Sequence, residues 1–120
     1  MSVSAAHATV FYEEIVKGGE VWAIRDAGGL PAPLNGGGFD RSMPFWSLRS
    51  RAERVIANVP DYRDFEPMAI PLDAWRTRWI DGLEGDGILV GLNWTGARAT
   101  GYDFGPAEVR TRLGAIENKE

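Results

Sequence analysis

The sequence contains no cysteine and a single histidine, His7, and this scarcity excludes several kinds of chemistry. Without cysteine, the chain can form no disulfide, no thiolate nucleophile and no thiolate metal site. One histidine cannot build a metal site that needs several. We therefore expect neither a metal ion nor any other cofactor, and we place His7 at the surface or boundary of a helix.

Positive charge is also scarce: Lys and Arg number 13 against 17 Asp and Glu, which gives a net charge of −4. Nucleic-acid-binding domains usually carry a basic surface, so we expect no nucleic-acid partner. The uncharged stretch at 87–97 is far shorter than the roughly 18–20 residues that span a bilayer. Residues 1–7 lack the basic and apolar segments of a secretory signal. These features predict a cytoplasmic protein that makes no membrane contact.

Motifs of common enzyme classes are missing as well. Gly36–Gly38 lacks the Lys-Ser/Thr pair of a phosphate-binding loop, and no Gly-x-Ser-x-Gly is present. Asp81, Glu84 and Asp86 do not have the spacing of an EF-hand calcium loop. The sequence thus offers no recognised catalytic residue.

The composition that is present is typical of one globular domain over residues 1–120. Hydrophobic residues make up 44% and charged residues 25%, close to the average of globular proteins. A chain of this length matches the usual size of one domain. Glycine and proline concentrate at 28–44, which predicts a long loop inside that domain.

Apolar residues recur at helical spacing in four segments, at 4–17, 48–58, 72–84 and from 106 onward. Strand-like alternation or turn boundaries mark five more, at 20–25, 43–46, 66–70, 87–94 and 97–102. In the second-last of these, Val90, Leu92 and Trp94 are expected on one face. We predict an α+β domain in which a small, mostly antiparallel or mixed sheet of about 4–5 strands packs one face against about 4 helices.

Several short motifs follow one another in an order that resembles a known family. They are Phe11-Tyr12, Val21-Trp22-Ala23-Ile24, Pro44-Phe45-Trp46-Ser47, Ile70-Pro71-Leu72 and Asp86-Gly87-Ile88-Leu89-Val90-Gly91-Leu92-Asn93-Trp94. In this order they resemble the bacterial family catalogued as domain of unknown function 2750, over nearly the whole chain. The resemblance implies a small stand-alone bacterial α+β domain. It implies no catalytic residues, so it supports the fold and leaves the function open.

Among the segments of the sequence, Trp46–Arg51 gives the most specific indication of a functional site. Ser47 is the predicted N-cap of the second helix. Arg49 and Arg51 then lie in its first turn, where the positive end of the helix dipole disfavours a cation by about 0.3–1 kcal/mol. A negative group should therefore lie close to these two arginines.

Two sources of that negative group stay open. One is a carboxylate from elsewhere in the fold, such as Asp26, Asp61 or Asp64. The other is a bound phosphate or carboxylate, held by free helix N–H groups, the Ser47 hydroxyl and the guanidinium groups of Arg49 and Arg51. Trp46 either packs on the helix as a hydrophobic staple or forms the aromatic wall of a shallow pocket.

These features favour a non-enzymatic binding or protein-interaction module. Its partner is a protein or a small anionic ligand, the latter held at Trp46, Ser47, Arg49 and Arg51, and a homodimer stays open as well. The first alternative is an immunity-type protein that neutralises a toxin. The second is a small metal-free enzyme that uses carboxylate and arginine chemistry.

Overall fold

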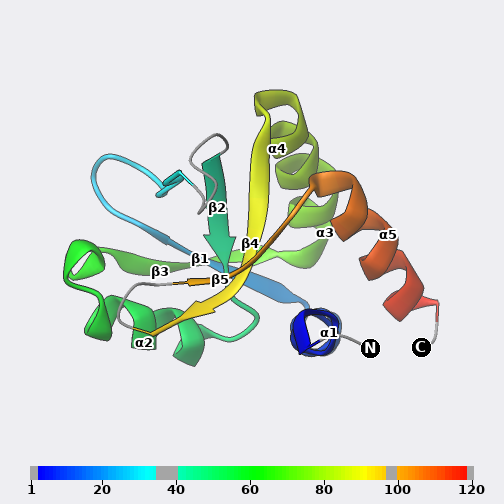
Figure 1. Cartoon of the computed structure of the whole chain (residues 1–120), viewed down its shortest axis with the longest axis horizontal. Coiled ribbons are helices and arrows are strands. Elements are labelled where there is room, and N and C mark those ends of the chain that lie inside the picture. Colours follow the sequence, from blue (N-terminus) through cyan, green and yellow to red (C-terminus); the bar gives the residue numbers. More distant parts are fainter. Residues whose placement is uncertain (1–2, 35–40, 97–99, 119–120) are drawn as a thin grey trace.

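The computed structural model describes residues 3–34, 41–96 and 100–118 of the chain (Figure 1). Three sequence predictions fall outside this part: the placement of the His7 side chain, the Gly36–Gly38 stretch, and residues 97–99 of the last expected strand. The fold described below is that of the remaining residues.

The helices lie close to the segments that carry helical spacing. They are α1 (Val3–Gly18), α2 (Arg49–Asn58), α3 (Leu72–Ala74), α4 (Ile80–Asp86) and α5 (Pro106–Glu117). A π-helical turn, Trp75–Trp79, joins α3 to α4, so 72–86 form one continuous helix. A short 3-10 turn at Pro60–Tyr62 follows α2, where Pro60 stops the α-helix.

The strands are β1 (Glu20–Arg25), β2 (Arg41–Phe45), β3 (Glu66–Pro71), β4 (Ile88–Thr95) and β5 (Thr100–Phe104). Within the described ranges they make two sheets: an antiparallel β1–β3 pair, and a mixed sheet in the order β2-β4-β5 whose β2–β4 pairing is parallel. The α+β prediction is therefore confirmed. The expected single sheet is divided, because β1 and β2 share only the bridge between Trp22 and Trp46 before the chain turns toward α2.

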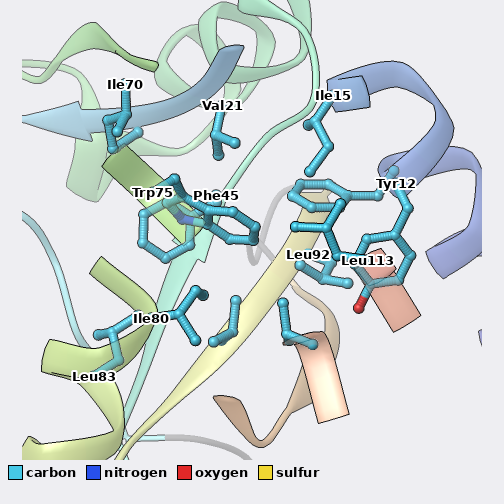
Figure 2. Packing of buried hydrophobic residues seen from close by; sticks show 14 of the residues in the cluster. Tyr12, Ile15, Val21, Phe45, Ile70, Trp75, Ile80, Leu83, Leu92 and Leu113 are labelled. Carbon is cyan, nitrogen blue, oxygen red and sulfur yellow. The ribbon is translucent and has the colours of Figure 1, made fainter. Parts of the chain in front are cut away.

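A larger hydrophobic cluster fills the space between the strands and helices α1, α4 and α5 (Figure 2). Phe45 and Trp75 lie near its centre, with ring centroids 5.5 Å apart. The other fully buried side chains of high volume in this larger cluster are Tyr12, Phe11, Ile15, Ile80, Leu113, Val21, Val90 and Val109. Trp75, expected in a helical stripe, is confirmed as part of the core, and Trp79 packs against it.

A smaller hydrophobic cluster lies on the opposite face of β1, under α2. It consists of Ile24, Trp46, Ala52, Val55, Val59 and Trp94, with Trp22 packed against it. Side chains alternate between the two faces of β1: Trp22 and Ile24 face the smaller cluster, and Val21 and Ala23 lie in the larger cluster. Helices thus cover both faces of the strand layer, and the expectation that they cover one face is wrong.

Trp94 departs from the expected strand pattern. Asn93 has a positive φ of 51°, and the β4–β5 register shifts between Leu92 and Thr95. This irregularity turns Trp94 away from the face of Val90 and Leu92, and its ring covers the backbone of Gly91 and Gly101. Asparagine tolerates a left-handed backbone better than most residues, so the local sequence permits the switch.

Candidate functional site

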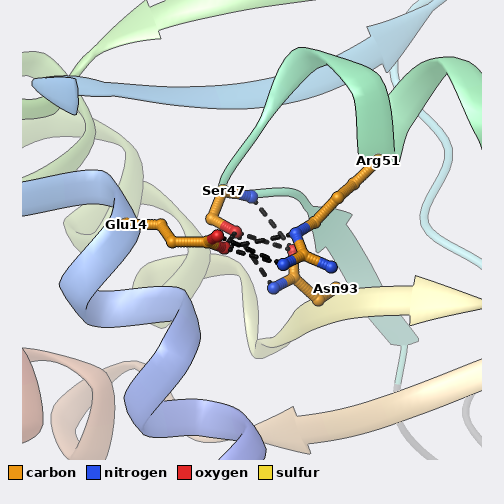
Figure 3. Close-up of polar contacts among 4 residues, drawn as sticks. All are labelled: Glu14, Ser47, Arg51 and Asn93. Carbon is orange, nitrogen blue, oxygen red and sulfur yellow. Dashed lines mark hydrogen bonds and ion pairs between the residues drawn. The ribbon is translucent and has the colours of Figure 1, made fainter. Parts of the chain in front are cut away.

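Four polar side chains from four parts of the fold meet beside the smaller cluster (Figure 3). Glu14 comes from α1, Ser47 from the turn after β2, Arg51 from the first turn of α2 and Asn93 from the irregular part of β4. We call these residues the polar junction. It connects helices α1 and α2 to the centre of the mixed sheet.

The Asn93 amide pairs with Ser47 in both directions. The Ser47 backbone N–H donates to Asn93 Oδ1 at 3.0 Å, and Asn93 Nδ2 donates to Ser47 Oγ at 3.0 Å. The Ser47 hydroxyl in turn donates to Glu14 Oε1 at 2.5 Å. Ser47 is only 4% exposed, so its hydroxyl is occupied on both sides and closed to solvent.

Glu14 also holds Arg51 in a two-point ion pair. Arg51 Nε donates to Oε1 and Nη2 donates to Oε2, both at 3.2 Å. The side chains of Arg51 and Glu14 are 30% and 26% exposed, so the pair is only partly screened by water. A carboxylate from elsewhere in the fold thus accompanies Arg51, although it is Glu14 and none of the three aspartates suggested by the sequence.

Arg49 lies apart from the polar junction. Its Nε is 3.4 Å from Glu53 Oε2, one turn along α2, and its guanidinium carbon lies 5.5 Å from the centre of the Trp22 ring. Residues two apart on a helix project about 200° from each other. Helical geometry therefore places Arg49 and Arg51 on opposite sides of α2, and one anion cannot bridge them.

The N-terminus of α2 also differs from the prediction. Leu48 is the N-cap, with no side-chain capping bond, so the assignment of Ser47 as N-cap is wrong. The hydroxyl faces Glu14 and Asn93 because the chain enters the helix one residue later than expected.

Trp46 is fully buried and packs with Ala52 in the smaller cluster. Its Nε1 donates to the Trp94 carbonyl at 2.9 Å. The ring therefore holds α2 against the sheet, as the staple interpretation expects, and presents no surface to a ligand.

A cleft of about 550 Å³ opens next to the polar junction. Its polar lining comes from Arg51, Asn93, Thr95 and Tyr102, and its apolar lining from Ala8, Val10 and Leu92. A small hollow continues from it past Arg51 and Thr95 to Arg54 and Asn58. Of the four residues chosen from the sequence, only Arg51 lines this cleft; Thr95, Tyr102 and Arg54 were not anticipated.

No cluster of three or more metal-ligating side chains exists among the residues that the structure describes. The Ser47 hydroxyl is buried, so it is not presented to a reactant. Within the same ranges, no helix is long and apolar enough to cross a membrane.

A model of one protein family matches residues 8–113 of the chain, with the description "Protein of unknown function (DUF2750)". The motifs along the sequence indicate the same family. Searches of curated proteins and of solved structures gave no match.

Proposed function

The chain belongs to the DUF2750 family of proteins of unknown function, and we propose that it is a non-enzymatic binding module for a small anionic ligand. The ligand binds in the cleft beside the polar junction. The observation that carries this proposal is an arginine, Arg51, fixed by Glu14 at the edge of a cleft that also offers amide, hydroxyl and apolar groups.

Fixing the guanidinium favours recognition. Arg51 uses Nε and Nη2 on Glu14, so its plane is set before a ligand arrives. A preorganised group loses less conformational entropy on binding than a free one. The planar fork of arginine is also suited to carboxylate and phosphate oxygens.

Arg54 supplies the charge that the ion pair of Arg51 lacks. It lines the hollow that continues the cleft and is exposed. In the described part of the chain it forms no ion pair or side-chain hydrogen bond. Glu14, Arg51 and Arg54 together carry a charge of +1, which favours an anion.

The rest of the lining indicates the shape of that anion. Asn93 and Thr95 offer hydrogen-bonding groups on the β4 side, while Val10 and Leu92 offer apolar surface. Sites for small molecules combine a mostly apolar wall with a few placed polar groups. We therefore assign the cleft to a carboxylate or phosphate ester with a compact apolar body.

Thermal denaturation with phenylacetate as the probe, and inorganic phosphate for comparison, tests this assignment. A ligand that binds only the folded state stabilises it by RT ln(1 + [L]/Kd), so the melting temperature rises with the logarithm of the ligand concentration once that concentration exceeds Kd. Phenylacetate at millimolar concentration should raise it, and Arg54→Gln should remove most of the rise. Arg63→Gln, which deletes an exposed charge outside the cleft lining, should leave it intact.

The same titration separates the cleft from the anion site expected from the sequence. Arg49→Ala should preserve the effect of phenylacetate, because Arg49 lies over Trp22 and not in the cleft. The proposal fails if neither anion shifts the melting temperature, or if Arg54→Gln and Arg63→Gln reduce the shift equally.

A further inference from the structure

A second hollow lies on another side of the molecule, between α4 and the starts of β2 and β4. It has a volume of about 290 Å³ and shares no lining residue with the anion cleft. Its apolar lining comes from Met43, Trp79, Leu83 and Ile88, and its rim from Arg78, Gly82 and Asp86. We call this surface the α4 groove.

The apolar side chains of the α4 groove are held in place from behind. Met43, Trp79 and Ile88 are half-buried and pack against the larger cluster. Phe45 meets the Trp79 ring edge-on, with centroids 6.1 Å apart. A rigid half-buried aromatic ring beside aliphatic side chains is typical of protein-contact surfaces.

The rim of the α4 groove carries a positive charge at one end and a negative charge at the other, so two antiparallel copies of it would place opposite charges together. Arg78, Gly82 and Asp86 follow one another at four-residue intervals, so they run along one side of the helix over about 12 Å. In the described ranges, neither Arg78 nor Asp86 forms an ion pair or a side-chain hydrogen bond, and both are exposed. Asp86 ends the helix, where the dipole disfavours negative charge.

From this pattern we infer that the α4 groove binds a second copy of this chain around a two-fold axis near Gly82. A two-fold axis places the same patch on both subunits, so Arg78 of each copy meets Asp86 of the other. Gly82 lies midway between the two charges, and even a Cβ at this position would meet nothing within 4 Å in the single chain. The two helices can therefore approach closely at the axis.

Charge reversal and exchange test this dimer in the full chain. Sedimentation equilibrium should show a reversible dimer of the unmodified protein at micromolar to submillimolar concentration. Arg78→Glu places Glu against Asp86, and Asp86→Arg places two arginines together, so each change should weaken the dimer by about tenfold or more. Circular dichroism controls for folding, since both positions are exposed.

Two combinations of these variants distinguish the proposed pairing of Arg78 with Asp86 from a general effect of charge. The double variant Arg78→Glu with Asp86→Arg restores both pairs in exchanged form and should dimerise again. An equimolar mixture of the two single variants should form a heterodimer, because all its facing pairs are then of opposite sign. Gly82→Gln should weaken the unmodified dimer without any change of charge.

The inference is overturned if the unmodified protein stays monomeric over the whole range, which would leave the α4 groove to some other protein. It is also overturned if the single variants dimerise as well as the parent, or if neither combination recovers association. None of these results bears on anion binding, because the two sites have no residue in common.

Discussion

The two hydrophobic clusters on either side of β1 differ in whether their buried polar atoms have hydrogen-bond partners. In the smaller cluster both central indoles donate: Trp46 Nε1 to the Trp94 carbonyl at 2.9 Å and Trp94 Nε1 to Asp103 at 3.0 Å. In the larger cluster, within the described residues, Tyr12 Oη and Trp75 Nε1 are buried without a partner. Directional hydrogen bonds therefore orient the side chains of the smaller cluster, whereas the larger cluster depends on the filling of space by its side chains.

This difference indicates in which cluster the stability of the fold is more sensitive to the substitution of a side chain. The smaller cluster holds few residues, and its hydrogen bonds define how α2 and the polar junction sit on the sheet. The larger cluster draws side chains from many elements and can repack around a lost atom. Substitutions of equal size should therefore cost more in the smaller cluster.

The largest expected effect comes from the central tryptophans. Trp46→Ala and Trp75→Ala should each lower the free energy of unfolding by about 3–5 kcal/mol, because each empties a buried site. The loss should be larger for Trp46→Ala, because Trp46 lies in the smaller cluster. Urea denaturation measures both values.

Replacement of the same tryptophans by phenylalanine distinguishes the clusters. Trp46→Phe removes the donor to the Trp94 carbonyl, which adds about 1–3 kcal/mol to the loss of packing. Trp75→Phe removes an N–H group that has no partner, which offsets part of its packing loss. Equal losses in the two phenylalanine variants would contradict the comparison.

An intermediate effect is expected where glycine makes room for Trp94. A Cβ at Gly91 would lie 2.5 Å from the indole Nε1, so Gly91→Ala should cost about 1–3 kcal/mol through overpacking. Gly114→Ala, in α5 with nothing within 4 Å, should instead gain up to about 1 kcal/mol from helix propensity. Thermal denaturation of the pair checks the sign, and a harmless Gly91→Ala would mean that the ring is not held there.

The smallest effect concerns Tyr12 and appears at high pH. Burial raises the pKa of Tyr12 above its ordinary value of 10.0, against the opposing charge of Arg112. The unfolded chain loses this proton above pH 10 while the folded chain keeps it. Stability that is complete below that pH therefore declines as the pH rises further.

Replacement of tyrosines tests that decline. Tyr12→Phe should flatten the alkaline loss of stability, and at neutral pH it should be neutral or stabilising by about 1 kcal/mol, since the hydroxyl has no partner. Burial also raises the pKa of Tyr62, but this residue is only half-buried, so Tyr62→Phe should flatten the loss less. Urea denaturation at pH values on both sides of 10 gives the comparison, which fails if Tyr62→Phe has the larger effect.

Most of the fold was predictable because it depends on local patterns. Helical spacing and strand alternation indicated the segments that form α1, α2, the helix at 72–86, α5 and the strands. The pairing of those strands is a property of distant segments, and here the sequence pattern could not show the division into two sheets. Asn93 illustrates a local limit, since one left-handed residue moved Trp94 to the other face.

The sequence could predict that a negative group lies near Arg51, but it could not predict which residue supplies that group. The dipole argument required a negative group near Arg51, and one is present. Its identity, Glu14, depends on how α1 packs beside α2, which no spacing in the sequence reveals. The cleft, the α4 groove and their rims likewise arise only from tertiary packing. The toxin-neutralising and enzymatic alternatives and the cytoplasmic location stay predictions.

The parallel pairing of β2 with β4 has a consequence for synthesis on the ribosome. The partner of β2 is made about 40 residues after it, which takes roughly 2–8 s at about 5–20 residues per second. During that interval Phe45 and Met43 have no strand to join. The nascent chain therefore carries an unpaired apolar edge, which chaperones that bind extended segments are suited to shield.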